Sequence, residues 1–405
     1  MNYPQEYLDA VEIYRDCFSE PQFDNFCRYL FGLAINESKK NIETINDSFV
    51  EVINQATLNN FVTDSPWDYQ KLRNKRITLI NQMIEKYCFP EEEIVLILDD
   101  IVIPKTGKNM EGSGYFYSTT AGRSIWGHNF VSSFISCFPI YSCVDVWQYF
   151  KTEFCDKNEM QFKKKTDAAA DQIIEYNPPE NRSVTVTFDS FYLCKKVIRP
   201  IKARNWQWIS RLKIDRVIYY HDTKMTVADL LKRCVKELEY RGVDVEGRKF
   251  YTLPPVDIYI PDVGQAQLLF VKPPGTFDNK DDLYTSDPYP YVCSDESLHR
   301  KKVLWGYVQR SCIENGYRDE KQNLGLGEYQ VRKLKGIYHH AQLVFTIHPL
   351  LIYMSLKQTG DIRLITIGEI CTWLRQLRDR ENVKWIYEQF QNGASLKDTL
   401  VKLGL

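Results

Sequence analysis

The sequence is short of the features that mark membrane, secreted and zinc proteins. It has no run of 18 or more apolar residues, and its start, MNYPQEYLDAVEIYRD, is acidic and polar, unlike a signal peptide. Its eleven cysteines are odd in number and contain no CxxC motif, and its six histidines show no metal-ligand spacing. We therefore expect a cytoplasmic protein with reduced, largely buried thiols, no membrane contact, no disulfide framework and no zinc site.

Net charge is also nearly absent: 52 basic residues face 53 acidic ones, for a formal charge of −1. This balance argues against a protein that coats DNA by bulk charge, but it allows local basic surfaces. One stretch, Lys195–Arg216, holds eight basic residues, including Arg211 and Lys213, and only one acid. Trp206 and Trp208 lie within it, either as stacking partners in a nucleic-acid channel or as core residues of a strand.

The most informative stretch is Trp305–Lys321, WGYVQRSCIENGYRDEK. At about 100° per residue, Tyr307, Arg310, Glu314 and Lys321 fall within one narrow stripe of a single helix. A core stripe would be apolar, whereas this one sets a carboxylate between a guanidinium and an ammonium. A metal-dependent phosphodiester enzyme needs such a set, although a solvated face with salt bridges would read the same way.

The spacing Tyr-x2-Arg-x3-Glu-x6-Lys resembles the signature of the DDE insertion-sequence transposases, in the branch named for its Tyr–Arg–Glu–Lys helix. The sequel LGLGEYQVRKLKGIYHHAQLV, Leu324–Val344, is similar to that branch as well. The resemblance implies a ribonuclease-H-like core in which two aspartates and the glutamate meet. It also implies that Arg310 and Lys321 bind phosphates and that Tyr307 donates a hydrogen bond to one.

The residue pattern predicts strands independently of that resemblance. The β-branched run Ile94–Ile103 predicts a buried strand, although two adjacent acids, Asp99 and Asp100, interrupt it. Because successive strand residues face opposite ways, only one of the two acids should point into a given site. The runs Tyr115–Thr120 and Asn129–Ile140 complete an antiparallel three-strand meander.

A helix and two more strands follow this meander. They are expected at Glu159–Tyr176, at Ser183–Phe188, which ends on Asp189, and at Trp206–Leu212. We predict a mixed α/β fold: a five-stranded sheet with helices, interrupted by a β-rich insertion and flanked by helical regions. The order of elements is that of the fold which the resemblance implies.

Asp100, Asp189 and Glu314 are the predicted catalytic acids. Carboxylates suit Mg²⁺ or Mn²⁺, and two such ions activate the attacking hydroxyl and stabilise the leaving oxygen in phosphodiester chemistry. In the family the first aspartate is commonly followed by threonine, whereas Ile101 follows Asp100 here, so the choice between Asp99 and Asp100 stays open. Asp189 also has an alternative reading, as an acid that caps the following turn.

Five regions are expected. They are a helical DNA-binding domain (1–90), a first part of the catalytic core (91–214), a β-rich insertion that does not continue the core sheet (215–300), a second part of the core (301–365) and a helical tail (366–405). Arg73, Lys75 and Arg76 would give the first region a basic face, unless it is an ordinary helical cap on the core.

The sequence thus predicts a transposase that binds the terminal inverted repeats of its element and cleaves and joins DNA strands. We expect a homodimer on paired ends, associated with the nucleoid and without a small-molecule cofactor. The family's hairpin step at the element ends uses a tryptophan of the insertion, which has none here, so one of several tyrosines would stack instead: Tyr251, Tyr259, Tyr284, Tyr289 or Tyr291. The alternatives are a domesticated DNA-binding protein without activity and a nuclease without strand transfer.

Overall fold

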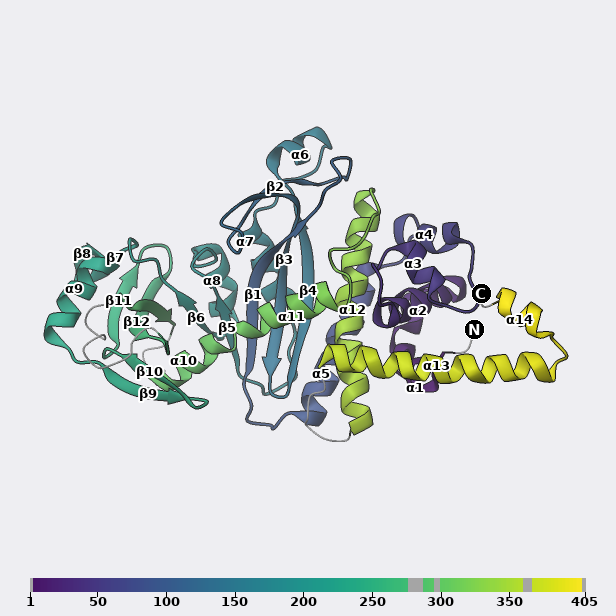
Figure 1. Cartoon of the computed structure of the whole chain (residues 1–405). Coiled ribbons are helices and arrows are strands. Elements are labelled where there is room, and N and C mark those ends of the chain that lie inside the picture. Colours follow the sequence, from purple (N-terminus) through teal and green to yellow (C-terminus); the bar gives the residue numbers. More distant parts are fainter. Residues whose placement is uncertain (1–2, 276–286, 295–298, 360–365, 403–405) are drawn as a thin grey trace.

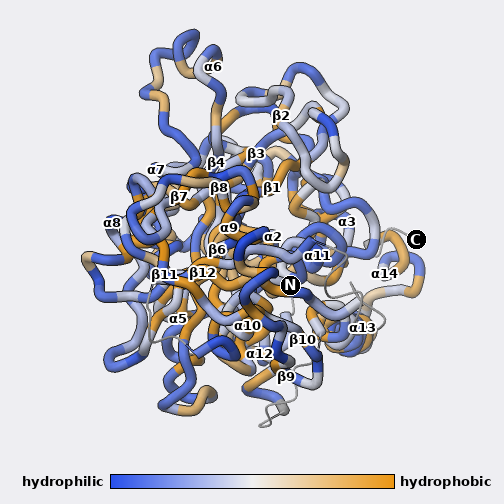
Figure 2. Tube along the Cα trace, turned by 90° about the vertical axis from the view of Figure 1, so that its left-hand side faces the viewer, coloured by the Kyte–Doolittle hydropathy of each residue, from blue (hydrophilic) through white to orange (hydrophobic). Residues whose placement is uncertain are grey.

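The computed structural model describes residues 3–275, 287–294, 299–359 and 366–402. A mixed sheet lies in the middle of the molecule, with the N-terminal and C-terminal helices at one end and the insertion at the other (Figure 1). Hydrophobic residues gather along the central strands, and hydrophilic ones follow the outer loops (Figure 2). No helix of the described ranges combines the length and the apolar character needed to cross a membrane.

The core sheet has the spatial order β4-β3-β1-β5-β6. Strand β3 is antiparallel to β1 and β4, whereas β5 is parallel to both β1 and β6. The bounds are β1 Ile94–Pro104, β3 Arg123–Cys137, β4 Ile140–Tyr149, β5 Val184–Phe188 and β6 Gln207–Arg211. Along the chain, four strands and two helices precede β5 and β6, so the predicted succession of strands, helix and two further strands is confirmed except that the first group has four strands instead of three and α6 precedes the predicted helix.

One of the three strands predicted for the meander was wrong. The third long strand is β4, which the sequence reading missed, because the run from Asn129 to Ile140 joins β3 to a tight turn and to the start of β4. The run near Tyr115 is instead β2 (Gly114–Ser118), a short strand that pairs only with the first residues of β3.

Helices cover both faces of this sheet. On one face lie α7 (Lys165–Glu175) and α8 (Lys195–Ala203), and Gln172 of α7 donates a hydrogen bond to the Val131 carbonyl. On the other face lie α11 (Ser311–Gln322) and α12 (Leu334–Thr359). The predicted helix from Glu159 begins only at Lys165, and the short α6 (Thr152–Lys157) precedes it.

The insertion continues the core sheet, contrary to expectation. Its last strand, β13, pairs antiparallel with β6, and β12, β11, β7 and β8 follow outward. Without β13, β6 would be an edge strand with unpaired backbone groups, and this pairing satisfies them. The bounds are β7 Val217–Tyr220, β8 Thr223–Thr226, α9 Val227–Glu237, β9 Arg241–Val245, β10 Arg248–Thr252, β11 Val256–Ile260, β12 Gly264–Lys272 and β13 Tyr289–Cys293.

The terminal regions are helical, as expected. The N-terminal elements are α1 Gln5–Val11, a 3₁₀ helix Glu12–Cys17, α2 Glu20–Ile35, α3 Ile42–Asp47, α4 Gln55–Thr63 and α5 Tyr69–Tyr87. The C-terminal ones are α13 Ile367–Gln391 and α14 Leu396–Lys402. Side chains of α1–α5, α12 and α13 share one continuous hydrophobic core with the sheet.

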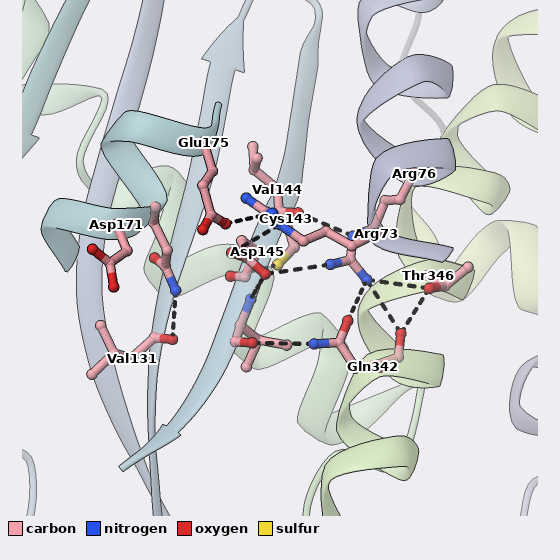
Figure 3. A network of polar contacts seen from close by, with 12 residues as sticks. Arg73, Arg76, Val131, Cys143, Val144, Asp145, Asp171, Glu175, Gln342 and Thr346 are labelled. Atoms are coloured by element: carbon pink, nitrogen blue, oxygen red, sulfur yellow. Dashed lines mark hydrogen bonds and ion pairs between the residues drawn. The ribbon is translucent and has the colours of Figure 1, made fainter. Parts of the chain in front are cut away.

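The basic residues of α5 do not form the exposed face predicted for them. Arg76 is fully buried, and its guanidinium donates hydrogen bonds to the Val144 carbonyl and to the side chains of Gln342 and Thr346. Arg73 forms ion pairs with Asp145 at 2.9 Å and Glu175 at 2.6 Å. Figure 3 shows this network joining α5, β4 and α12. These arginines therefore fasten the helical region to the core and cannot reach DNA.

All eleven cysteines are free thiols, and nine of them are buried, as predicted. Trp208 is also fully buried, which favours the core reading for that residue.

Candidate active site

The two adjacent acids of β1 point to opposite faces of the sheet. Asp99 lies opposite Ser132 of β3, and Asp100 lies opposite Val131. Ser132 bonds to the Tyr317 hydroxyl on α11 at 2.6 Å, whereas the Val131 carbonyl accepts from α7. We call the side that faces α11 the Asp99 face.

Asp189 follows β5 directly and belongs to the Asp99 face. Phe188 is the parallel partner of Leu98, so the next residue of each strand, Asp189 and Asp99, stand side by side with side chains on one face. The Asp189 carboxylate accepts a hydrogen bond from the Phe191 backbone N–H at 2.9 Å, which fixes the turn after the strand. This is the local role foreseen in the capping reading, and it leaves the second carboxylate oxygen for other partners.

Glu314 reaches the same face from α11. The close approach of this helix depends on Gly316, because a Cβ there would lie 2.2 Å from the Phe134 ring. The predicted continuous helix 305–321 is in fact two helices, α10 (Arg300–Val308) and α11, separated at Gln309 and Arg310. Hydrogen bonds of the i→i+3 type tighten the backbone at this junction.

Arg310 joins the acids across the site. Its guanidinium forms an ion pair with Asp99 at 2.6 Å and another with Glu314 at 3.2 Å. Its Nε is buried and has no acceptor among the described residues. The side chains of Arg310 and Asp99 are each 18% exposed, whereas that of Glu314 is 63% exposed. The site is thus walled by β1 and open on the helix side.

Burial, together with the nearby charges of Asp100 and Asp189, raises the pKa of Asp99 to about 7, although Arg310 opposes the shift. Burial is the main cause of this raised pKa, and the two neighbouring acids add to it, so a bound cation would favour the ionised carboxylate. Burial also raises the pKa of Tyr307, against the positive charges of Arg310 and Arg211.

Asp100 has a different set of partners, all on the opposite face. The Lys165 ammonium donates to it at 2.6 Å, Asn129 at 2.8 Å and the Tyr192 hydroxyl at 3.1 Å. In addition, the Asp100 backbone N–H donates to the Asp99 carboxylate at 2.9 Å. The three donors leave Asp100 well satisfied, and its backbone helps to orient Asp99.

The other predicted residues divide into two groups. Tyr307 lies near Arg310, and its ring meets that of Tyr291 on β13 edge-on at 4.4 Å. Arg211 stacks over the Tyr289 ring at 4.2 Å, so β13 brings two tyrosines to this end of the site. Tyr284 lies outside the described residues.

Lys321 and Lys213 are both exposed and contact none of the acids through an ion pair in the described part of the chain. Lys321 stands about two turns beyond Glu314 on the same side of α11, since seven residues rotate a helix by roughly 700°. Lys213 lies just past β6.

The insertion also touches the junction between α10 and α11. Glu246, at the turn between β9 and β10, accepts hydrogen bonds from Trp305 at 3.1 Å and Gln309 at 3.3 Å. The sequence did not predict this contact, because a single glutamate in a turn carries no signal of its distant partners.

Among the described residues, no three His, Cys, Asp or Glu side chains are grouped closely enough to form a ready-made metal site. The donors nevertheless fit a hard cation: two carboxylates, Asp99 and Glu314, pair with one guanidinium, and the charge of Asp189 lies near enough to raise the pKa of Asp99.

The fold and the site define a class: a mixed sheet of nuclease type, with one aspartate inside strand β1, a second directly after β5 and a helix-borne glutamate. A family model described as DDE superfamily endonuclease matches residues 14–232, more than half of the chain. The chain belongs to this family, and its core is accordingly ribonuclease-H-like with a nuclease-type activity. The matched segment includes Asp99, Asp100 and Asp189 but ends before Glu314. No curated protein matches the chain.

Proposed function

We propose that this protein is a DDE transposase that binds the terminal inverted repeats of an insertion sequence and cleaves and joins DNA strands there. The acidic set is Asp99, Asp189 and Glu314, with Asp99 in the place that the sequence favoured for Asp100. The carrying observation is the bridge of Arg310 between Asp99 and Glu314, on the face that Asp99 shares with Asp189.

The three carboxylates would hold a pair of Mg²⁺ or Mn²⁺ ions, which supply an activated water or 3′-hydroxyl and stabilise the leaving oxygen. Asp99 has to give up its proton for this purpose. The Asp100 backbone N–H orients its carboxylate, and Arg310 balances its charge when no other cation is bound.

The cations around the acids bind the DNA backbone. Arg310 has an unused Nε donor and is well placed to exchange a carboxylate for a phosphate, whose geometry it matches equally well. Tyr307, Arg211 and Lys213 contact phosphates toward β6, and Lys321 contacts one two turns along α11. Tyr289, 38% exposed and stacked on Arg211, is our candidate for a base-stacking residue if excision passes through a hairpin.

A second copy of the chain completes the complex on paired ends. Exposed apolar side chains run along the ends of α13 and α14, at Val383, Tyr387, Leu396 and Val401. An antiparallel contact of two copies near Val383 and Tyr387 would be self-complementary in charge, since a basic residue, Arg380, lies before this pair and an acidic one, Glu388, follows it.

A cleavage assay on DNA that carries the ends of the element tests this function. With Mg²⁺, we expect wild-type protein to cut at the element ends and to join them to a target. Asp99→Asn, Asp189→Asn and Glu314→Gln should each lower cleavage at least 100-fold while end binding persists.

Asp100→Asn is the matched control for Asp99→Asn, and it should keep measurable cleavage. If Asp99→Asn cleaves like the wild type and Asp100→Asn does not, the assignment of the first acid is overturned. Binding without cleavage by the wild type would favour the domesticated alternative, and cleavage without joining would favour a nuclease.

A further inference from the structure

The hairpin formed by β2 and the start of β3 has a surface that the proposed site does not use. Tyr115 is 59% exposed and Tyr117 is 64% exposed, whereas Phe116 between them is buried against Tyr149. Two large rings therefore stand in solvent on one side of a short strand. This strand, β2, pairs with the part of β3 that extends beyond the end of β1.

The two rings lie on the Asp99 face. Tyr115 is opposite Trp126 and Tyr117 is opposite Ser124, and these β3 residues have the same parity as Ser132, the partner of Asp99. Six residues of β3 separate Ser132 from Trp126, so Tyr115 stands about 20 Å from Asp99 along the strand at roughly 3.3 Å per residue. A DNA strand covers that distance with about six nucleotides.

The hairpin is also held firmly and carries a basic excess. The Trp126 indole donates to the Gly107 carbonyl at 3.0 Å, and its ring meets that of Tyr115 edge-on at 5.3 Å. The exposed basic residues around it are Lys108, Arg123 and Arg332. The nearby acid, Glu111, has its carboxylate engaged by the Leu334 backbone N–H at 2.7 Å.

We propose that Tyr115 and Tyr117 bind an unpaired base of the DNA strand about six nucleotides from the scissile phosphate, with Lys108, Arg123 and Arg332 on the phosphates beside it. Side chains two apart on a strand are spaced by roughly 6.6 Å, close to twice the stacking distance of about 3.4 Å, so one base fits between the two rings. This site deepens the proposed function and rests on it for its substrate, DNA.

The test is a fluorescence-anisotropy titration of a 12-nucleotide oligo(dT) and of a duplex of equal length, with the Glu314→Gln chain so that DNA stays intact. Added Tyr115→Ala and Tyr117→Ala substitutions should weaken oligo(dT) binding about tenfold or more and duplex binding less than threefold. Tyr115→Phe with Tyr117→Phe should restore binding, because phenylalanine keeps the ring.

Phe89→Ala is the matched control, since Phe89 is 60% exposed but precedes β1 at the opposite end of the strand. It should change neither affinity. The proposal is overturned if the double alanine variant binds oligo(dT) like its parent, or if both DNA forms lose affinity equally. This titration needs no cleavage, so a protein that fails to cut DNA would refute the proposed function without deciding the hairpin.

Discussion

Replacing Asp99 by asparagine should remove activity and yet stabilise the fold at high pH. The native pKa of Asp99 is raised from 3.8 to about 7. The native state therefore holds a proton that the unfolded state releases between these two values, and the penalty on folding grows as pH rises from about 4 to 7 and is complete above 7. Asparagine carries no such penalty.

The size of this penalty in free energy follows from the linkage between proton binding and folding. A shift of roughly three units corresponds to about 4 kcal/mol at most, and about 3 kcal/mol of it accrues between pH 4.5 and 8. The attraction of Arg310 for the ionised carboxylate is already part of this pKa shift and is not subtracted again. We therefore expect the effect of Asp99→Asn on unfolding free energy to be about 3 kcal/mol more favourable at pH 8 than at pH 4.5.

Urea unfolding at the two pH values, in EDTA so that no divalent cation neutralises the site, measures this difference. Asp100→Asn is the control: it leaves the Lys165 ammonium without its carboxylate, and we expect it to destabilise the protein at both pH values. If Asp99→Asn changes the unfolding free energy equally at pH 4.5 and 8, Asp99 does not have a raised pKa in the folded protein.

Two further predictions concern DNA and assembly. Arg310→Ala and Lys321→Ala should each weaken binding to element ends and lower the slope of log affinity against log salt by about 1, because each removes about one phosphate contact; equal slopes in variant and wild type would argue against the contact. Val383→Lys with Tyr387→Lys should convert a dimer to a monomer in sedimentation, whereas the wild type sediments as a dimer at the same concentration; a dimeric double variant would place the interface elsewhere.

The sequence predicted the core well because its strands carry local signals. The β-branched run that became β5 is buried throughout and that of β1 is buried over Ile94–Leu98, and Asp189 directly follows β5. The helix that carries Glu314 was visible as a stripe of charge. Its division at Gln309 and Arg310 was not, because both residues keep helical backbone angles and only the hydrogen-bond pattern changes.

The sequence-based prediction was wrong for charged residues that the fold buries. Arg73 and Arg76 resemble a basic helix face as long as α5 is considered alone. The side chains that pair with these arginines come from β4, α7 and α12, up to 270 residues away. No local sequence pattern predicts these partners. A buried arginine needs partners, but the sequence does not say whether a protein or DNA provides them.

The choice between Asp99 and Asp100 shows the same limit at the site itself. A strand that is covered on both faces lacks the apolar alternation that would distinguish its two sides. The sequence of β1 therefore does not show which of the two aspartates faces the site. What separates the acids is the cation that each face supplies: Lys165 from α7 for one, and Arg310 from α11 for the other. Lys165 is one of three donors that enclose Asp100, whereas Arg310 is shared with Glu314 and keeps a free donor. An acid whose oxygens are all occupied by its own donors has a structural role. An acid that shares its arginine with a second carboxylate can bind a metal ion instead, and the arginine is then available for a phosphate. For that reason Asp99 is the acid we assign to catalysis.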